Sequence, residues 1–351
     1  MSRIVIRADA GAVPEIGTGH MMRSIRLAGA LRGCTLFKQA EVRFATRLAA
    51  PFELGGDLVR KAGYEAIPDS GLEPNSEPEL RSILKADPDI VILDRLETSA
   101  ELVDGLKVAG IFIVTFDDLG PGRSHADLAI NALLHNIEPA PNSVVGYDYL
   151  PSVSDEITRN ETKPLASNVF VSFGGFDHRG LNAWLLRLIP DIKGPRRYEI
   201  VLSGLAENEL KTLKESADTA AALAGVDVVV LLRPEDFYKR LCASDLALVS
   251  GGLTAFGCAQ AGIPSIGVPQ YEHQLENIHR LQALGCLKSG TRGMDLDAGL
   301  FCSLVTKLSA DHNKRLAMSR AGVKAVDGKG LARTVNLIAS AYARAIGVGT
   351  G

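Results

Sequence analysis

Short apolar runs alternate with longer segments of helical periodicity along the first half of the chain. The runs IVIRAD, EVRFATR, DIVILD and IFIVTFDD, followed by a shorter DLAINA, are rich in β-branched residues and predict buried strands. After the first run, the apolar positions from Met21 to Leu31 recur at helical spacing and predict a helix with one broad apolar face. This alternation favours a parallel sheet with crossover helices.

A polar stretch with several prolines, from about His135 to Leu165, interrupts the alternation and predicts a linker. The pattern then restarts with SNVFVSFGGFD, YEIVLSG, VDVVVLL, DLALVSGG and PSIGVP. We therefore expect an α/β fold of two Rossmann-like domains, residues 1–150 and 165–330, with parallel sheets that face a central cleft. The helical pattern within residues 331–351 could pack back across the seam between them.

The composition mainly excludes classes of partner. The 351 residues carry a formal net charge of −3, which gives no electrostatic reason to expect nucleic acid or an anionic membrane surface. The five cysteines are scattered without CxxC spacing, so we expect reduced thiols, no metal site and no cofactor. Since no apolar stretch reaches about 18 residues and no secretory pattern is found, the expected location is the cytoplasm. The expected partner is a small molecule, and the oligomeric state stays open.

A histidine lies in the connection between the first predicted strand and the helix that follows it. In open α/β sheets this connection lies at the carboxyl end of the strand, where ligands bind. His20 therefore occupies a position suited to catalysis or binding, although a lone histidine at a turn also suits a structural role. A helix N-terminus disfavours the imidazolium, so the ring is expected to be neutral and able to accept a proton.

Pairs of glycines follow three of the predicted strands. They are Gly17 and Gly19, Gly174 and Gly175, and Gly251 and Gly252. Glycine at a strand end lets backbone N–H groups approach a phosphate, and a following helix N-terminus favours its negative charge. Three such pairs predict a phosphate-bearing substrate.

Three stretches together resemble a known family. They are RADAGAVPEIGTGHMMRSIRLA, VSFGGFD and SDLALVSGGLTAFGCAQAGIPSIGVPQYEHQ. Their order and spacing resemble the nucleotide-sugar hydrolases of pseudaminic acid biosynthesis, which remove UDP from a 2,4-diacetamido-2,4,6-trideoxy-altrose. Those enzymes are similar in fold to the peptidoglycan N-acetylglucosaminyltransferase, so the resemblance implies a GT-B-like fold.

The resemblance implies that His20 is the catalytic histidine. Its role would be to deprotonate a water that attacks C1 with inversion, while UDP leaves as an anion and needs little general acid. UDP would lie against the second domain and the sugar would reach His20. Asp9, which ends the first strand, would orient the imidazole or bind a sugar hydroxyl, and a loop-capping role is equally open.

Further contacts to the substrate and nucleotide are expected, and the resemblance supports those of Asp94, Asp118, Asn131, Gln274 and Asn277. The full set of expected contacts is Arg23, Asp94, Asp118 and Asn131 in the first domain, and Ser172, Gly174, Gly175, Gly251, Gly252, Thr254, Gln274 and Asn277 in the second. Structural alternatives stay open for some of them. Carboxylates at strand ends are routine helix caps, and Asp177 is expected to be one, while Arg23 also suits an exposed helix surface.

Two positions depart from the family's pattern. Gly257 stands where a glutamate usually binds the ribose, and Leu96 stands where a tyrosine usually follows the strand-end aspartate.

Taken with the resemblance, the sequence predicts hydrolysis of a nucleotide-activated sugar, with a UDP-linked 2,4-diacetamido-2,4,6-trideoxyhexose as substrate and a bacterial surface glycan as destination. A GT-B glycosyltransferase with a sugar or lipid acceptor, or a nucleotide-sugar-binding relative without catalysis, remains an alternative.

Overall fold

The chain folds into parallel β-sheets flanked by helices. The computed structural model describes residues 2–11, 16–68, 72–133, 140–151, 157–158, 161–174, 176–202 and 207–348. The chain divides into unit 1, Met1–Ser152 with Gly328–Gly351, and unit 2, Val153–Asp327. Gly175, one of the predicted site residues, lies outside the described residues.

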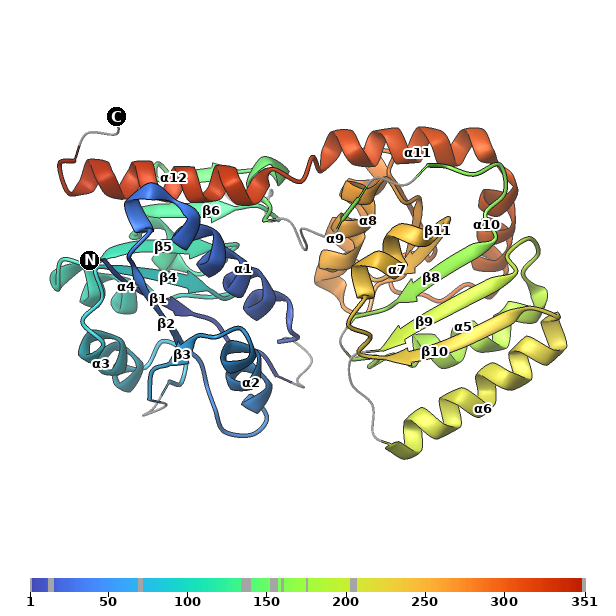
Figure 1. The fold of residues 1–351 in the computed structure, drawn as a ribbon, viewed down its shortest axis with the longest axis horizontal. Coiled ribbons are helices and arrows are strands. Elements are labelled where there is room, and N and C mark those ends of the chain that lie inside the picture. The colour runs from blue at the N-terminus through green and yellow to red at the C-terminus, as the bar shows by residue number, and fades with distance from the viewer. Residues whose placement is uncertain are drawn as a thin grey trace. The chain divides into compact units, whose positions relative to one another are not determined.

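Unit 1 contains a parallel sheet that has seven strands within the described residues, in the order β3-β2-β1-β4-β5-β6-β7 (Figure 1). The strands are β1 (Arg3–Arg7), β2 (Glu41–Ala45), β3 (Glu65–Ala66), β4 (Ile90–Asp94), β5 (Phe112–Phe116), β6 (Leu128–Asn131) and β7 (Ser143–Val145). The helices are α1 (Gly19–Gly33), α2 (Glu53–Lys61), α3 (Glu77–Lys85), α4 (Ala100–Val108) and α12 (Gly330–Ala345), with short 3-10 turns η1 (Thr35–Phe37), η2 (Pro121–Ser124) and η3 (Tyr147–Tyr149).

Successive residues of the central strands face opposite layers of unit 1. Ile4 and Ile6 of β1 belong to the core beneath α1 and α12, whereas Val5 belongs to the core beneath α3 and α4. All residues of β4 and β5 are buried, as expected for strands covered on both faces. Side-chain caps begin two of the helices, because Ser76 accepts from the third residue of α3 and Ser99 does the same for α4.

The last helix, α12, belongs to the core of unit 1. Tyr342 packs its ring against Phe37 and Phe112, with centroid distances of 5.9 and 5.5 Å. The buried Thr334 hydroxyl donates to the Tyr149 carbonyl at 2.8 Å. Because η3 and β7 lie within the stretch predicted as a linker, the first part of that stretch is built into unit 1.

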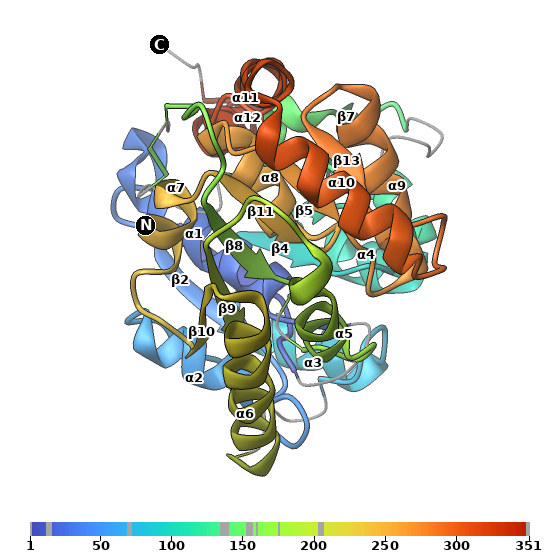
Figure 2. The same cartoon turned by 90° about the vertical axis from the view of Figure 1, so that its right-hand side faces the viewer.

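Unit 2 contains a second parallel sheet, with six strands in the described residues and the order β10-β9-β8-β11-β12-β13. Its strands are β8 (Asn168–Ser172), β9 (Arg197–Leu202), β10 (Asp227–Leu232), β11 (Leu246–Val249), β12 (Ser265–Gly267) and β13 (Leu287–Ser289). Its helices are α5 (Leu181–Leu188), α6 (Glu207–Ala224), α7 (Phe237–Ala243), α8 (Leu253–Ala261), α9 (Glu272–Ala283), α10 (Ala298–Ala310) and α11 (His312–Ala325), with one 3-10 turn η4 (Ile189–Asp191). Figure 2 shows α5 and α6 side by side, in agreement with their contacts.

The strand order reverses direction once in each sheet. In unit 1 the reversal lies between β1 and β4, and in unit 2 it lies between β8 and β11. Crossover helices leave a crevice outside the carboxyl ends of the strands at such a point, and open α/β sheets bind their ligands there. The fold therefore marks one ligand position in each unit. Within the described residues, no helix combines the length and the apolar character needed to cross a lipid bilayer.

The packing of α12 makes Gly330 sensitive to substitution. A Cβ at Gly330 would lie 2.0 Å from the Leu150 carbonyl oxygen, whereas a Cβ at Gly33, at the end of α1, would meet nothing within 4 Å. We expect Gly330→Ala to lower the free energy of unfolding by about 1–3 kcal/mol through overpacking. Gly33→Ala is the matched control and should leave stability equal or slightly higher. Calorimetric unfolding of both variants tests this, and equal stability of the two would contradict the described packing.

Candidate active site

A buried cluster of charged side chains occupies the carboxyl ends of β4 and β5 in unit 1. His20 and Arg23 come from the first turns of α1, Asp94 is the last residue of β4, and Asp117 follows β5. Arg23, Asp94 and Asp117 are each at most 5% exposed, while the His20 side chain keeps 22% of its surface exposed. The imidazole is therefore the member of the cluster that meets solvent.

Asp94 holds the imidazole. Its Oδ1 lies 2.7 Å from His20 Nδ1. Burial alone would raise the pKa of Asp94, but the charge of Arg23 and the contact with His20 outweigh burial and hold that pKa well below the ordinary value. Because Asp94 is ionised, we assign the ring proton to Nδ1, which donates to the carboxylate and leaves Nε2 as an acceptor.

Arg23 is buried and pairs with two carboxylates. Its Nε donates to Asp94 Oδ2 at 3.0 Å, and its terminal nitrogens pair with Asp94 and Asp117. The Ser24 hydroxyl adds a fourth contact to Asp94, at 2.9 Å from Oδ2. The alternative of an exposed helix cation is thus wrong for Arg23, which reaches carboxylates in this structure.

Asp117 was not among the predicted site residues. Its backbone adopts φ +46°, in the left-handed region that few side chains favour, and its Oδ1 accepts from the Leu133 N–H at 2.7 Å. The signal in the sequence is the Asp-Asp pair after β5, of which only Asp118 is a predicted site residue. The two neighbours differ because the left-handed turn directs one carboxylate to Arg23 and the other into a loop.

Asp118 is a loop-capping residue in the structure. Its Oδ1 accepts from the N–H groups of Thr98 and Gly120, at 3.0 and 2.8 Å, and the residue is fully buried. Burial raises its pKa despite these hydrogen bonds. Asn131, the last residue of β6, is likewise buried at the carboxyl end of its strand, with 1% of its surface exposed. A direct substrate contact by either side chain stays a prediction.

Asp9 belongs to a second ion cluster. Its carboxylate pairs with Arg7 at 2.7 Å and with Arg47 at 2.9 Å. Arg7 also binds Glu79 at 2.5 Å, and Glu79 in turn binds Arg95. Burial opposes ionisation of Asp9, but the two arginines outweigh it and lower its pKa. One of the roles open for Asp9, the orienting contact to the imidazole, is made by Asp94 instead, because β4 lies next to β1 and presents its own terminal carboxylate there.

The predicted glycine pair before His20 lies at the start of α1. Gly19 is the first residue of α1, and a side chain at Gly17 would meet nothing within 4 Å. Thr18 caps α1 without a side-chain hydrogen bond, and the first turn of this described helix carries no acidic residue. The first amides of α1 therefore have no side-chain acceptor from their own first turn.

In unit 2, the predicted phosphate turns follow the paired strands β8 and β11. Ser172, the last residue of β8, is in register with the last residue of β11. Gly174 has φ +107°, which a side chain would strain. Gly251 packs against α9, because a Cβ there would lie 2.3 Å from the Gln274 carbonyl oxygen, and Asn277 donates to the Gly251 carbonyl at 2.9 Å. These predicted residues lie together at the strand reversal of unit 2.

The N-terminus of α8 is the open helix end at this position. Gly252 is its N-cap, with no side-chain cap bond, and no acidic residue lies in the first turn, which contains Thr254. Asp177, by contrast, closes α5 by accepting from the Leu181 and Asn182 N–H groups at 2.7 and 2.8 Å. The predicted capping role of Asp177 is therefore confirmed. A helix N-terminus without a side-chain cap favours an anion, so α8 suits one better than α5 does.

The remaining predicted residues of unit 2 have structural contacts. The Gln274 Oε1 accepts from the Gln270 N–H at 2.8 Å, which ties α9 to the loop after β12. Gly257 is buried within α8.

Burial raises the pKa of the Cys258 thiol and raises that of Cys286 to about 11, so both stay protonated near neutral pH. Among the described residues, no group of His, Cys, Asp or Glu is arranged to hold a metal ion.

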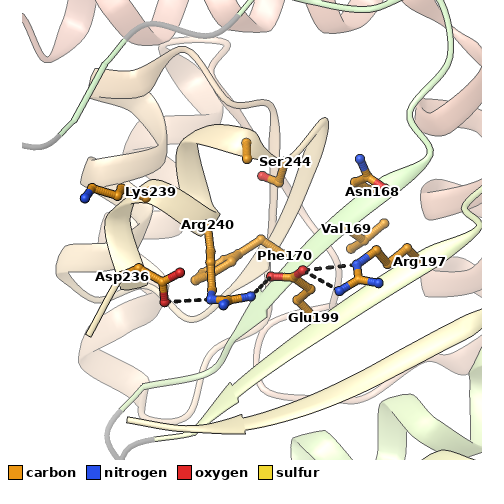
Figure 3. A pocket seen from close by; sticks show the side chains of 10 residues that line it. Asn168, Val169, Phe170, Arg197, Glu199, Asp236, Lys239, Arg240 and Ser244 are labelled. Carbon is orange, nitrogen blue, oxygen red and sulfur yellow. Dashed lines mark hydrogen bonds and ion pairs between the residues drawn. The ribbon is translucent and has the colours of Figure 1, made fainter. Parts of the chain in front are cut away.

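A cavity of about 330 Å³ in unit 2 lies between α7 and the strands β8 and β9 (Figure 3). Asn168 and Arg197 line it and are the first residues of β8 and β9, so the cavity lies toward the strand ends opposite to the α8 N-terminus. Its carboxylates are already paired, since Glu199 binds Arg197 at 3.0 Å and Arg240 at 3.2 Å, and Arg240 also binds Asp236 (Figure 3). These side chains therefore satisfy one another.

Comparisons with known proteins agree with this architecture. No protein-family model matches the chain. The spore coat polysaccharide biosynthesis protein SpsG of Bacillus subtilis (strain 168) is 24% identical over 356 residues, which cover 97% of this chain and 99% of SpsG. Among solved structures, MurG of Acinetobacter baumannii is similar with a TM-score of 0.70 and 16% identity, covering 97% of this chain and 100% of MurG.

A second solved structure extends the comparison. The spinosyn rhamnosyltransferase SpnG, complexed with thymidine diphosphate, has a TM-score of 0.60 and 16% identity, covering 97% of this chain and 99% of SpnG. The fold is GT-B-like. This confirms the predicted class of two parallel-sheet α/β domains.

The charge of Asp94 is expected to stabilise unit 1 in a pH-dependent way. Asp94→Asn keeps the shape of the side chain but leaves the buried Arg23 with one carboxylate, so we expect the free energy of unfolding at pH 7 to fall by about 3–5 kcal/mol. The pKa of Asp94 is lowered from 3.8 in the folded chain, so its contribution is complete above that value and is lost as the pH falls through the folded pKa. The difference between wild type and variant should therefore narrow below a pH of about 4.

Urea unfolding at pH 7 and at several acidic pH values measures this difference. Asp104→Asn serves as the control, because Asp104 is exposed and its ion pair with His125 lies on the surface. We expect the control to stay within about 0.5 kcal/mol of wild type. A loss for Asp94→Asn that is independent of pH would show that the carboxylate charge contributes nothing.

Proposed function

We propose that this protein is an enzyme that breaks the bond between a sugar and a nucleoside diphosphate, with His20 as the general base. The observation that carries the proposal is the pairing of His20 Nδ1 with the ionised Asp94 at 2.7 Å, which leaves Nε2 as a proton acceptor on the exposed side of the cluster. A base that accepts a proton near neutral pH suits the activation of a hydroxyl group.

The proposed reaction needs one proton transfer by the protein. Nε2 of His20 takes the proton of the attacking hydroxyl as its oxygen forms a bond to C1 of the sugar. The bond between C1 and the diphosphate oxygen breaks at the same time, so the configuration at C1 inverts. The diphosphate leaves as an anion and needs no acid. Asp94 stabilises the imidazolium that forms, as a carboxylate does beside the histidine of other nucleophile-activating sites.

Unit 2 carries the proposed nucleotide site. Its support is the open N-terminus of α8, together with the glycines after β8 and β11, whose backbone allows close approach of a phosphate. The similar SpnG structure is a complex with thymidine diphosphate. We extend this to a nucleoside diphosphate for the present chain, and Gly257 leaves the choice of nucleoside open.

Transfer to an organic acceptor is the form of the reaction that we favour. Leu96 and Leu119, which follow Asp94 and Asp117 by two positions, are 37% and 50% exposed. They are neighbours, because the Leu119 N–H donates to the Leu96 carbonyl at 2.7 Å. An exposed apolar pair two positions after the two carboxylates supports an acceptor with apolar surface, and the similar solved structures include glycosyltransferases.

Hydrolysis is the second candidate. It rests on the resemblance of the motifs around His20 to the hydrolases of pseudaminic acid biosynthesis, whose substrate is a UDP-linked 2,4-diacetamido-2,4,6-trideoxyhexose. The full-length similarity to SpsG, a spore coat polysaccharide biosynthesis protein, fits a role in a bacterial surface glycan under either candidate.

We expect His20→Asn to lower turnover by about 100-fold or more, the range for loss of a general base, while nucleotide affinity stays unchanged. His125→Asn is the matched control, because His125 also pairs with an aspartate through Nδ1 at 2.8 Å but lies exposed in the same unit. Turnover of the two variants, and their binding of UDP and TDP by calorimetry, test the proposal. Near wild-type turnover of His20→Asn would refute the assigned base.

Product analysis separates the two candidate reactions. The protein is incubated with a panel of UDP- and TDP-linked sugars, with and without alcohol acceptors of increasing apolar surface, and nucleotide release is followed by chromatography. Under the transferase proposal, release requires an acceptor and a glycoside appears in equal amount. Release at the same rate in buffer alone, with free sugar as product, would establish the hydrolase instead.

A further inference from the structure

The charge around His20 depends on a carboxylate that does not touch the imidazole. Arg23 lies between Asp94 and Asp117 and pairs with both. Without Asp117, one arginine and one aspartate would cancel beside His20. With Asp117, two carboxylates and one guanidinium leave a net charge of −1 next to the ring.

We propose that Asp117 is a positioning residue for the general base, which acts through Arg23 to favour the protonated form of His20. The inference rests on the proposed function, because it concerns the proton that His20 takes in the reaction. Asp117 binds one terminal nitrogen of Arg23 and thereby both fixes the guanidinium and offsets its charge. Asp94 then remains available to stabilise an imidazolium.

The groups that face His20 from the surrounding elements support this assignment. From α1 comes Arg23, from the end of β4 comes Asp94, and from the turn after β5 comes Asp117. After the end of β1, Asp9 is already paired with two arginines of the second cluster. The distance of 3.4 Å between Arg23 and His20 Nδ1 is longer than the 2.7 Å from Asp94, so the arginine acts on the ring as a nearby charge.

The backbone holds Asp117 in place independently of Arg23. The residue has φ +46°, its N–H donates to the Ile130 carbonyl at 2.9 Å, and its Oδ1 accepts from the Leu133 N–H at 2.7 Å. A carboxylate fixed by β6 and the segment that follows it does not move when the imidazole changes charge. Such a preorganised charge is what stabilises a charge that develops during a reaction.

The test follows the titration of His20 directly and needs no substrate. Proton–nitrogen correlation spectra of the imidazoles are recorded from about pH 5 to pH 9, and the His20 signal is identified by its absence in His20→Gln. We expect Asp117→Asn to lower the pH midpoint of this signal by on the order of one pH unit. The substitution removes a full negative charge beside the buried Arg23, whose positive charge then opposes protonation of His20. An unchanged or raised midpoint would overturn the proposal.

Two further variants separate charge from structure. Asp127→Asn removes a carboxylate that binds Lys107 and the Ile113 N–H in the same unit, and it should leave the His20 midpoint unchanged. Asp117→Gly also removes the charge and suits the left-handed backbone, so it replaces Asp117→Asn if that variant fails to fold. An equal shift in Asp127→Asn would assign the effect to general destabilisation and overturn the proposal.

Kinetics supply a second readout once a substrate is found. In Asp117→Asn, the acid limb of the kcat profile should move to lower pH by the same amount as the midpoint, and kcat should fall with nucleotide affinity unchanged. A loss of kcat with no movement of the limb would mean that Asp117 has a structural role only. The failure of the proposed function is distinguishable, because in that case His20→Asn stays active whatever the spectra show.

Discussion

A guanidinium buried between two carboxylates determines how the carboxyl edge of unit 1 is built. Arg23 joins α1 to β4 and to the turn after β5, three elements that are distant in sequence. Removing such charges from water costs several kcal/mol each, and only complete pairing offsets that cost. The hydroxyl of Ser24 donates a further hydrogen bond to Asp94, and the N–H of Leu133 donates to the Asp117 oxygen that Arg23 does not bind. The exposed imidazole thereby acquires a fixed direction from groups that never reach solvent.

The two units carry different kinds of groups at the carboxyl ends of their strands. Unit 1 brings ionised side chains together, and the same sheet edge carries a second network around Arg7 and Glu79. Unit 2 offers backbone groups instead, at the glycines after its paired strands and at the start of α8. Side-chain charges suit proton transfer, whereas backbone amides suit a diphosphate whose charge does not change sign.

Much of the fold was predictable because buried parallel strands read as continuous apolar runs. The five runs predicted in the first half correspond to β1, β2, β4, β5 and β6. Three short strands, β3, β7 and β13, were missed, because two or three residues are too few to carry a pattern, and β7 lies among prolines and polar residues. The position of His20 at the start of α1 was predicted correctly from the handover between strand and helix.

The partners of His20 were less predictable. Asp94 is 74 residues away and reaches the imidazole only because β4 pairs with β1, a pairing that the local pattern does not encode. The choice between Asp117 and Asp118 depends on one backbone angle. The sequence points to the right edge of the sheet, while strand order and backbone conformation decide which carboxylate is used.

The placement of α12 makes unit 1 discontinuous along the chain. Val335 and Ile338 of α12 belong to the same apolar core layer as β1. All of unit 2 is synthesised after β1 and before α12. On the ribosome, the contiguous unit 2 has its whole sequence available before unit 1 does. The first portion of unit 1 has an uncovered apolar layer until α12 is synthesised, and such a state is prone to aggregation. The usual order of domain completion, from N-terminus to C-terminus, is thus reversed in this chain.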